Sequence, residues 1–250
     1  MIVMCILFFS TVPWTTVLHY FLFPDTPILL PTVLPPRWRY SSLVYWGYSF
    51  VPMYYAFGIW QEMWIVSLLV VVYIFSILPL INCEFRVGPL KHKSSPELRS
   101  SVWNLTAEYR RVEVMHQLFL DIIGSPLLVL QFAFGQFSLF CNVSVIHGRD
   151  SMDTPTKLLL ILWSLTMQIM WILVLETSGY FREYAKTTLR SWKQLSCASR
   201  EEKSYFSKFR RGCRPLKIGT GGVFTITRLS SPKFMRSIIR GTFRALLIRK

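Results

Sequence analysis

The sequence has little charge for its length. Of its 250 residues, 16% are charged and 52% are hydrophobic, and the mean hydropathy is +0.38. An ordinary soluble domain carries about a quarter charged residues. The first 83 residues contain only four Asp, Glu, Lys or Arg side chains: Asp25, Arg37, Arg39 and Glu62. This low content of charged residues argues against a water-soluble fold and indicates a membrane protein.

The sequence also lacks the side-chain groupings that hold metals, disulfides or catalytic centres. Its five cysteines are widely spaced and include no CxxC pair. Its four histidines form no HExxH-type spacing. The run from Gly219 to Gly222 is followed by Val223, where a phosphate-binding loop has Lys and then Ser or Thr, so we predict a turn there. We therefore expect no metal, no cofactor and no catalytic residue, and we do not expect an enzyme.

Positive charge is concentrated at the C-terminal end. The net charge is +15, and the stretch from Glu176 to Lys250 contains 18 basic and 4 acidic residues. A nucleic-acid-binding domain needs a soluble scaffold, and more than half of this chain offers water no polar face. We therefore expect no nucleic acid partner. The expected partner of the basic tail is the anionic surface of a lipid bilayer.

Five apolar stretches are close to the length of about 20 residues that a helix needs to cross a hydrocarbon core. The predicted spans cover residues 1–23, 43–60, 63–83, 122–141 and 158–175. The predicted fold class is therefore all-α, a multi-pass transmembrane helical bundle. Residues 1–175 are assigned to this transmembrane region, 176–228 to a basic cytoplasmic loop, and 229–250 to a basic amphipathic or pore-type helix.

Local signals fix one boundary and the orientation. Asp153, followed by Thr154 and Pro155, is expected to cap the fifth span, because Asp accepts hydrogen bonds at helix N-termini and proline suits the first turn. Cytoplasmic loops carry an excess of Lys and Arg. The two basic loops, 84–117 and 176–228, then lie on the cytoplasmic side and Met1 lies outside.

The last apolar stretch, Leu229 to Leu247, carries a row of cations. Lys233, Arg236, Arg240 and Arg244 recur at spacings of three and four residues, which puts them on one face of a helix. A charge at the centre of a spanning helix costs about 3 kcal/mol on insertion scales. The helix therefore either faces a water-filled path or lies in the membrane interface, and the sequence slightly favours the interface.

The segment from Ser207 to Leu247 reads SKFRRGCRPLKIGTGGVFTITRLSSPKFMRSIIRGTFRALL. It resembles the C-terminal region of insect-type gustatory and odorant chemoreceptors, in the divergent form found in springtails. The resemblance is most specific at Cys213, Pro215, Leu216 and Phe224. The upstream pieces ELRSSVWNLTAEYR and LETSGYFREYAKTTLRSWKQL fit the same pattern, so it covers roughly Tyr40 to the end.

The resemblance implies a seven-span receptor in the plasma membrane that assembles as a tetrameric ligand-gated cation channel. The five predicted spans would be the second to sixth, so relative to the family the chain would lack its first span. One departure concerns the last helix, where the family has Thr-Tyr and Gln-Phe pairs and this chain has Gly241-Thr242-Phe243-Arg244. A pore lined by arginine repels cations.

The resemblance also implies a pocket for a small organic ligand in the outer halves of the spans, where aromatic walls are expected. The candidate ligand-binding residues are Tyr54, Tyr55, Trp60, Trp64 and Trp163. The competing interpretation is that aromatic residues near helix ends form the belt at the membrane interface.

The sequence thus predicts a multi-pass membrane chemoreceptor for small organic molecules that acts as a homo- or hetero-oligomer. One alternative is an integral-membrane enzyme that modifies lipids or acyl chains, although an acid-base pair such as HxxxxD is absent from the sequence. Another alternative is a non-conducting accessory subunit, for which Pro52 and Pro126 are a faint hint because broken spans are typical of transporters.

Overall fold

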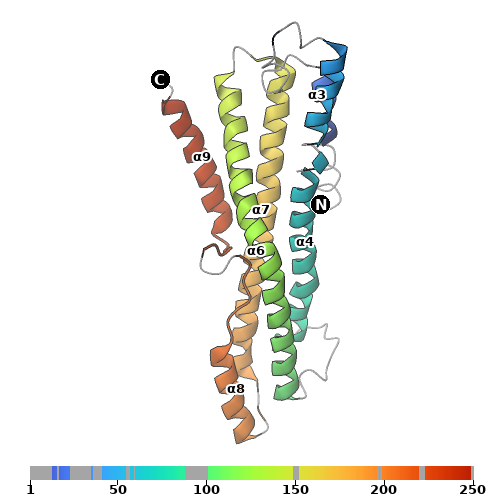
Figure 1. The fold of residues 1–250 in the computed structure, drawn as a ribbon. Coiled ribbons are helices and arrows are strands. Elements are labelled where there is room, and N and C mark those ends of the chain that lie inside the picture. The colour runs from blue at the N-terminus through green and yellow to red at the C-terminus, as the bar shows by residue number, and fades with distance from the viewer. Residues whose placement is uncertain are drawn as a thin grey trace. The chain divides into compact units, whose positions relative to one another are not determined.

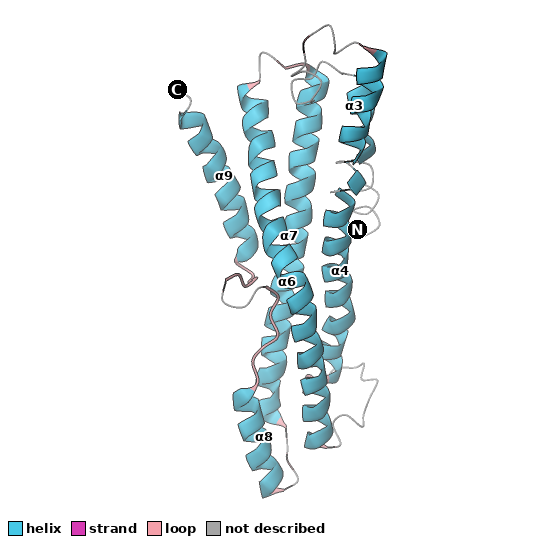
Figure 2. Ribbon diagram, viewed as in Figure 1, coloured by secondary structure: helices cyan, strands magenta, loops and turns pink. Residues whose placement is uncertain are grey.

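The structure is a computed structural model that describes residues 13–15, 17–22, 35, 41–54, 57–58, 60–87, 101–148, 152–195, 197, 199–219 and 223–248. Within these residues the chain forms helices joined by short connecting segments, with no strand (Figure 2). The all-α prediction is therefore confirmed for the described part of the chain.

The helices are labelled in Figure 1. They are α3 (Ser42–Tyr54), α4 (Trp60–Pro79), the π-helix η3 (Leu80–Glu84), α6 (Val102–His147), α7 (Thr154–Ser191), the 3-10 helix η4 (Trp192–Gln194), α8 (Arg200–Gly212) and α9 (Ser230–Ile248). Three helical segments, Trp64–Glu84, Val102–His147 and Thr154–Gln194, are long and apolar enough to cross a membrane. The protein is therefore a membrane protein, and the predicted spans at 63–83, 122–141 and 158–175 fall in these three segments.

The other two predicted spans are not confirmed. Most of residues 1–23 lie outside the described residues, although residues 17–22 are helical. The span predicted at 43–60 corresponds to α3, which has 13 residues. At 1.5 Å per residue this helix is about 20 Å long, which is less than the roughly 30 Å of a hydrocarbon core.

Two helices are much longer than the spans that the sequence predicts. α6 has 46 residues and α7 has 38, which correspond to about 69 Å and 57 Å, roughly twice a hydrocarbon core. Residues 176–191, grouped by sequence with the basic loop, are helical and continue α7. The basic segment 176–228 is thus helical over much of its length, because α8 follows α7.

The described residues belong to two compact units. Unit 1 comprises residues 1–67, 132–171 and 235–250, and unit 2 comprises residues 68–131 and 172–234. Each unit is described below by itself.

Unit 2 is organised around Trp192, which is 1% exposed. Its indole Nε1–H donates a hydrogen bond to the Phe85 carbonyl oxygen at 2.9 Å. Its ring packs edge-on against Tyr109 of α6, with centroids 4.9 Å apart, and against Phe206 of α8 at 5.7 Å. The buried indole of η4 therefore contacts the chain after η3, α6 and α8, and it holds these three segments together.

The end of α4 is widened into a π-turn at a proline. Pro79 has no N–H to donate, and such positions favour local departures from α-helical hydrogen bonding. The Phe85 N–H bonds the Leu80 carbonyl at 3.1 Å. The Ile81 carbonyl accepts a hydrogen bond from the Thr188 hydroxyl of α7 at 3.0 Å, so that buried carbonyl has a partner outside its own helix.

The sequence of α8 carries its own start and stop signals. The Ser199 hydroxyl caps the helix by accepting from the Glu202 N–H at 3.1 Å. Acidic side chains occupy the first turn, and Arg210 and Arg211 occupy the last, which complements the helix dipole. The apolar face contributes Phe206 to the core of unit 2.

After α8 the chain runs extended along residues 213–219 and returns along 223–227. The Ile226 N–H bonds the Ile218 carbonyl at 2.9 Å across this return. Gly219 has φ +137°, and a Cβ there would collide with the Phe224 carbonyl oxygen. Gly219 therefore occupies a position where only glycine fits, whereas the rest of the glycine-rich run, at which the sequence predicts a turn, lies outside the described residues.

Candidate functional site

Unit 1 contains a pocket of about 320 Å³ that lies between α6, α7 and α9 and is open to the outside; we call it the cavity. Its walls are mostly apolar. The lining residues are Asn142, Val145, Ile146, Ile161, Ser164, Leu165, Gln168, Ile238, Ile239, Thr242 and Phe243. Every lining side chain is uncharged, so the site offers shape and hydrogen bonds rather than ionic recognition.

A hydrogen-bonded chain of polar side chains crosses from α6 to α7 at this cavity. The Ser164 hydroxyl donates to Asn142 Oδ1 at 2.6 Å, and Gln168 Nε2 donates to Ser164 Oγ at 2.7 Å. Ser164 is 3% exposed. We call these three side chains the polar relay. In an apolar setting such interhelical bonds fix the spacing of two helices.

The polar relay leaves hydrogen-bonding groups at its ends. Within the described residues, no hydrogen bond engages the Asn142 amide N–H groups or the Gln168 carbonyl oxygen. Both side chains are half-buried and line the cavity. The cavity therefore presents a donor group and an acceptor to an occupant that carries complementary groups.

The third wall of the cavity is α9, which approaches α6 at a glycine. A Cβ on Gly241 would lie 2.7 Å from Cδ2 of Leu139, so glycine permits this contact. Phe234 and Ile238 are buried on the same side of α9. A second hollow of about 410 Å³ lies between α6 and α9 and includes Gly241 in its lining. α9 thus approaches α6 closely at Gly241, and a pocket lies on each side of this contact.

The predicted ligand residues lie elsewhere. Tyr54 is 72% exposed on α3 and Trp64 is half-buried on α4. Trp163 packs its ring against Phe137, with centroids 5.8 Å apart, and none of the three lines the cavity. Tyr55 and the Trp60 side chain lie outside the described residues. The proposal that these residues bind a ligand therefore stays a prediction.

Sequence reasoning did not identify the polar relay. A signal was present in Ser164 and Gln168, two polar residues one helical turn apart in an apolar stretch. Asn142 begins an Asn-Val-Ser tripeptide, the pattern of a glycosylation sequon, which does not indicate a contact with another helix. In the structure it belongs to α6 and its side chain binds Ser164.

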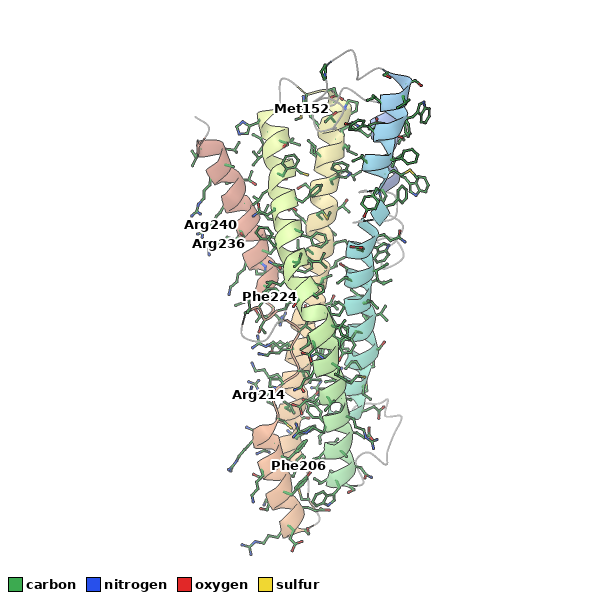
Figure 3. The ribbon with its side chains drawn as sticks, in the orientation of Figure 1. Met152, Phe206, Arg214, Phe224, Arg236 and Arg240 are labelled. Carbon is green, nitrogen blue, oxygen red and sulfur yellow. The ribbon has the colours of Figure 1, made fainter. Side chains whose placement is uncertain are left out.

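The four cations of α9 lie on its outer surface. Lys233, Arg236, Arg240 and Arg244 are all exposed. Figure 3 shows the side chains of Arg236 and Arg240 extending away from the neighbouring helices. Beside them on the helix surface, Ile239 and Phe243 are 51% and 63% exposed. The row predicted from the sequence spacing is therefore a continuous face of α9.

The residues that carry the family resemblance belong to unit 2. In the extended segment after α8, Leu216 is buried and its neighbours Cys213 and Pro215 are half-buried. Phe224 lies on the returning segment, residues 223–227. The extended segment, residues 213–219, is fixed to the long helices through its backbone carbonyls. These contacts involve side chains that the sequence analysis did not single out.

His116 of α6 is the main attachment point. Its Nε2–H donates to the Lys217 carbonyl oxygen at 3.0 Å, and its Nδ1 accepts from the Tyr73 hydroxyl at 2.8 Å. Because a carbonyl only accepts, these partners define the tautomer. The imidazole stacks on Tyr73 and Phe181, with centroids 5.7 Å and 5.5 Å away. We call this arrangement the His116 clamp.

Three further contacts hold the returning segment and the start of the extended segment. A Cβ on Gly179 of α7 would lie 3.0 Å from the Arg228 backbone nitrogen, so the returning segment passes close to the helix there. The Arg228 guanidinium lies 4.9 Å from the centre of the Tyr180 ring. The Tyr109 hydroxyl donates to the Arg214 carbonyl at 3.4 Å.

The thiol of Cys213 and the groups that could hold a metal were the remaining candidates for reactive chemistry. Burial, with a smaller contribution from the Glu113 carboxylate and against the opposing Arg110 guanidinium, raises the pKa of the Cys213 thiol to about 11. A thiol with such a pKa is a poor nucleophile at neutral pH. No group of three His, Cys, Asp or Glu side chains able to hold a metal occurs within the described ranges.

Comparison with known proteins adds no assignment. No protein-family model matches the chain, and no curated protein matches it with significant similarity. Function is therefore argued from the cavity and the helices around it.

Proposed function

We propose that the protein is a membrane receptor for small organic molecules, of the insect-type gustatory and odorant kind, and that its ligand occupies the cavity between α6, α7 and α9. The observation that carries this proposal is the cavity itself. Ligand sites are concave, mostly apolar and equipped with a few polar groups, with volumes from about 300 Å³ upward. The cavity of about 320 Å³ with the polar relay at its wall has these properties.

The polar relay defines the expected ligand chemistry. The Asn142 amide N–H groups suit a carbonyl, ether or hydroxyl oxygen, and the Gln168 carbonyl suits a hydroxyl or amide donor. The uncharged lining disfavours an ionic ligand, whose desolvation would have no compensation. A neutral alcohol, ketone or amide with an apolar body is the expected ligand class.

The place of α9 in the wall suggests how binding produces a signal. A ligand that touches Ile238 and Thr242 binds differently when α9 shifts. Such a difference in affinity is what allows a ligand to favour one position of a helix over another. The receptor is proposed to act in the plasma membrane as an oligomer, a tetramer by resemblance.

The enzyme alternative is less well supported because catalysis needs a group that exchanges a proton or attacks a bond. No ionisable side chain lines the cavity. The accessory-subunit alternative has no specific observation in its favour.

The test uses the full chain purified in lipid nanodiscs and a panel of neutral alcohols, ketones and amides with six to ten carbons. Binding is measured as the shift of the thermal unfolding midpoint; a ligand at about 100 times its Kd stabilises by about 2.7 kcal/mol. Alkanes and carboxylates of the same length are expected to give smaller shifts.

Matched variants locate the site. Leu165 and Ile169 are both 51% exposed and lie one turn apart on α7, but only Leu165 lines the cavity. Leu165→Trp is expected to weaken binding at least about tenfold, or roughly 1.4 kcal/mol, whereas Ile169→Trp leaves it unchanged. If no panel member shifts the unmodified chain, or if both variants bind equally well, the proposal is wrong.

A further inference from the structure

The second hollow of unit 1 is an open groove of about 410 Å³ between α6 and α9. Its floor is apolar, with Leu139, Phe140 and Val143 of α6 facing Gly241 and Ala245 of α9. The two small residues of α9 lie one helical turn apart and leave room beside α6. Phe140 is 52% exposed, so the mouth of the groove has an apolar border. We call this hollow the α6–α9 groove; its floor suits a hydrocarbon chain.

Hydrogen-bond donors line the same groove at the end of α6. Ser144 and His147 belong to its lining and lie in the last turn of the helix, where His147 is the final residue. Gln136 lines the groove farther back along α6. Within the described residues, no hydrogen bond engages these three side chains. A hydroxyl and an imidazole N–H both donate to an anionic oxygen, so this end of the groove suits a polar head.

α9 places an arginine at the edge of the groove. At 100° per residue, Arg244 is directed about 60° away from Gly241, whereas Arg240 and Arg236 are directed about 100° and about 140° away. Arg244 also directly precedes Ala245, which lines the groove, and it is exposed. The guanidinium of Arg244 is therefore the positive charge that borders this hollow.

The charge of Arg244 has no acidic partner within the described residues of unit 1. The two acidic residues described there are Glu62, in the first turn of α4, and Asp153, which caps α7 by accepting from Thr156. Neither forms an ion pair with Arg244. Arginine pairs with carboxylates through two parallel hydrogen bonds. An anion beside Arg244 would therefore meet a cation without a competing carboxylate.

The length of the groove matches one leaflet of a bilayer. From Gln136 to His147 the helix rises about 16 Å, and half of a hydrocarbon core is about 15 Å. These residues belong to Val102–His147, which is long and apolar enough to cross a membrane. Figure 1 shows α9 running beside α6 toward the same end at which α6 finishes. The donors thus lie where the helix ends, and the apolar floor extends from them toward the middle of the helix.

We propose that the α6–α9 groove binds a long-chain carboxylate that enters from the surrounding bilayer. Its hydrocarbon chain lies along Leu139 and Val143, and its carboxylate accepts hydrogen bonds from Arg244 and His147. The single narrow groove accommodates one chain, which favours a fatty carboxylate over a phospholipid with two chains. The proposal goes beyond the proposed function, because this site lies on the other side of the Gly241 contact from the cavity and does not depend on a neutral ligand.

The test uses the full chain in nanodiscs of phosphatidylcholine, labelled with a palmitate analogue that carries a photoreactive diazirine in its chain. The pH is about 8.5, well above the pKa of a carboxylic acid. Mass spectrometry locates the labelled residues, and unlabelled palmitate, hexadecanol and phosphatidylglycerol compete. Labelling is expected within residues 136–147 or 241–245, and palmitate is expected to compete about tenfold better than the other two, the size of one charge-assisted hydrogen bond.

Two matched variants test the head of the site. Arg244→Gln is expected to weaken palmitate about tenfold and to abolish the preference over hexadecanol. Arg236→Gln changes an equally exposed arginine of α9 that is directed away from the groove, and it is expected to leave labelling unchanged. Ala245→Leu fills the floor and is expected to weaken palmitate and hexadecanol equally.

Four results would each overturn the proposal. The first is labelling outside the groove that palmitate does not reduce. The second is equal competition by hexadecanol, which would show that no anion is recognised. The third is equal competition by phosphatidylglycerol, which would assign the groove to a bilayer phospholipid. The fourth is an equal effect of the two arginine variants. Leu165→Trp is expected to retain palmitate labelling, so failure here is distinguishable from failure of the ligand-binding proposal.

Discussion

The His116 clamp makes a prediction that follows from the contacts on both sides of one imidazole. Replacing His116 by Phe keeps a ring of similar shape beside Tyr73 and Phe181, so the stacking at 5.7 Å and 5.5 Å is largely preserved. The substitution removes both hydrogen bonds, at 2.8 Å and 3.0 Å. It leaves the Tyr73 hydroxyl and the Lys217 carbonyl without these partners.

The magnitude follows from the burial of those groups. Leaving a buried donor or acceptor unsatisfied costs about 1–3 kcal/mol each. When the extended segment detaches, the Lys217 carbonyl can accept a hydrogen bond from water. Most of the cost of the missing hydrogen bonds is therefore relieved by detachment, so the variant favours the detached state of this segment. A cost of about 2–4 kcal/mol, at 1.4 kcal/mol per factor of ten, raises the open population about 30- to 1,000-fold.

Limited proteolysis measures this opening. The Lys217 side chain is exposed while the adjacent Ile218 is buried, so trypsin cuts the bond between them only when the segment opens. The Arg214 bond is followed by Pro215 and resists trypsin, which makes Lys217 the informative site. His147→Phe, at an exposed histidine of α6, is the control and is expected to be cut at the rate of the unmodified chain. Unchanged cleavage at Lys217 in His116→Phe would refute the clamp.

Two other predictions concern the same unit. Gly219→Ala is expected to lower the thermal midpoint, because φ +137° strains a side chain and the Cβ collides with Phe224; such strain costs about 1–3 kcal/mol. Gly212→Ala, which meets nothing within 4 Å, is expected to leave the midpoint unchanged, and equal effects of the two would contradict this account. With a pKa near 11 against an ordinary 9.0, the Cys213 thiol is expected to react with iodoacetamide about a hundredfold more slowly at pH 8 than an ordinary thiol, with the rate rising about tenfold per pH unit up to pH 11. A plateau reached near pH 9 would contradict the effect of burial.

The parts of the fold that depend on local sequence were predictable. Trp64–Glu84 is a run of apolar residues whose length alone identifies a span. The start of α7 is likewise set by its own residues, since Asp153 accepts from the Thr156 N–H at 3.2 Å and from its hydroxyl at 2.7 Å. These hydrogen bonds also lower the pKa of the Asp153 carboxyl, against the opposing effect of burial. Signals of this kind need no knowledge of the rest of the chain.

The remaining features depend on partners that are distant in sequence. The helical extension of α7 past Leu175 has no apolar run to mark it, and it is stabilised where Trp192 reaches the Phe85 carbonyl, 107 positions away. The polar relay joins Asn142 to Ser164 across two helices. Neither pairing is marked by a periodicity or a motif in the sequence, because each depends on which faces of the helices pack together.

The contacts of α9 indicate how a ligand bound beside α6 and α7 would act on this helix. α9 touches α6 closely at Gly241 and has open space on both flanks, so it can roll about that line of contact. A roll of about 20° moves a side-chain atom that lies about 6 Å from the helix axis by about 2 Å. Ile238, which faces the cavity, and Arg240, on the outer face, move together in such a roll. A ligand held against the polar relay therefore acts directly on the position of the cations, without an intermediate element.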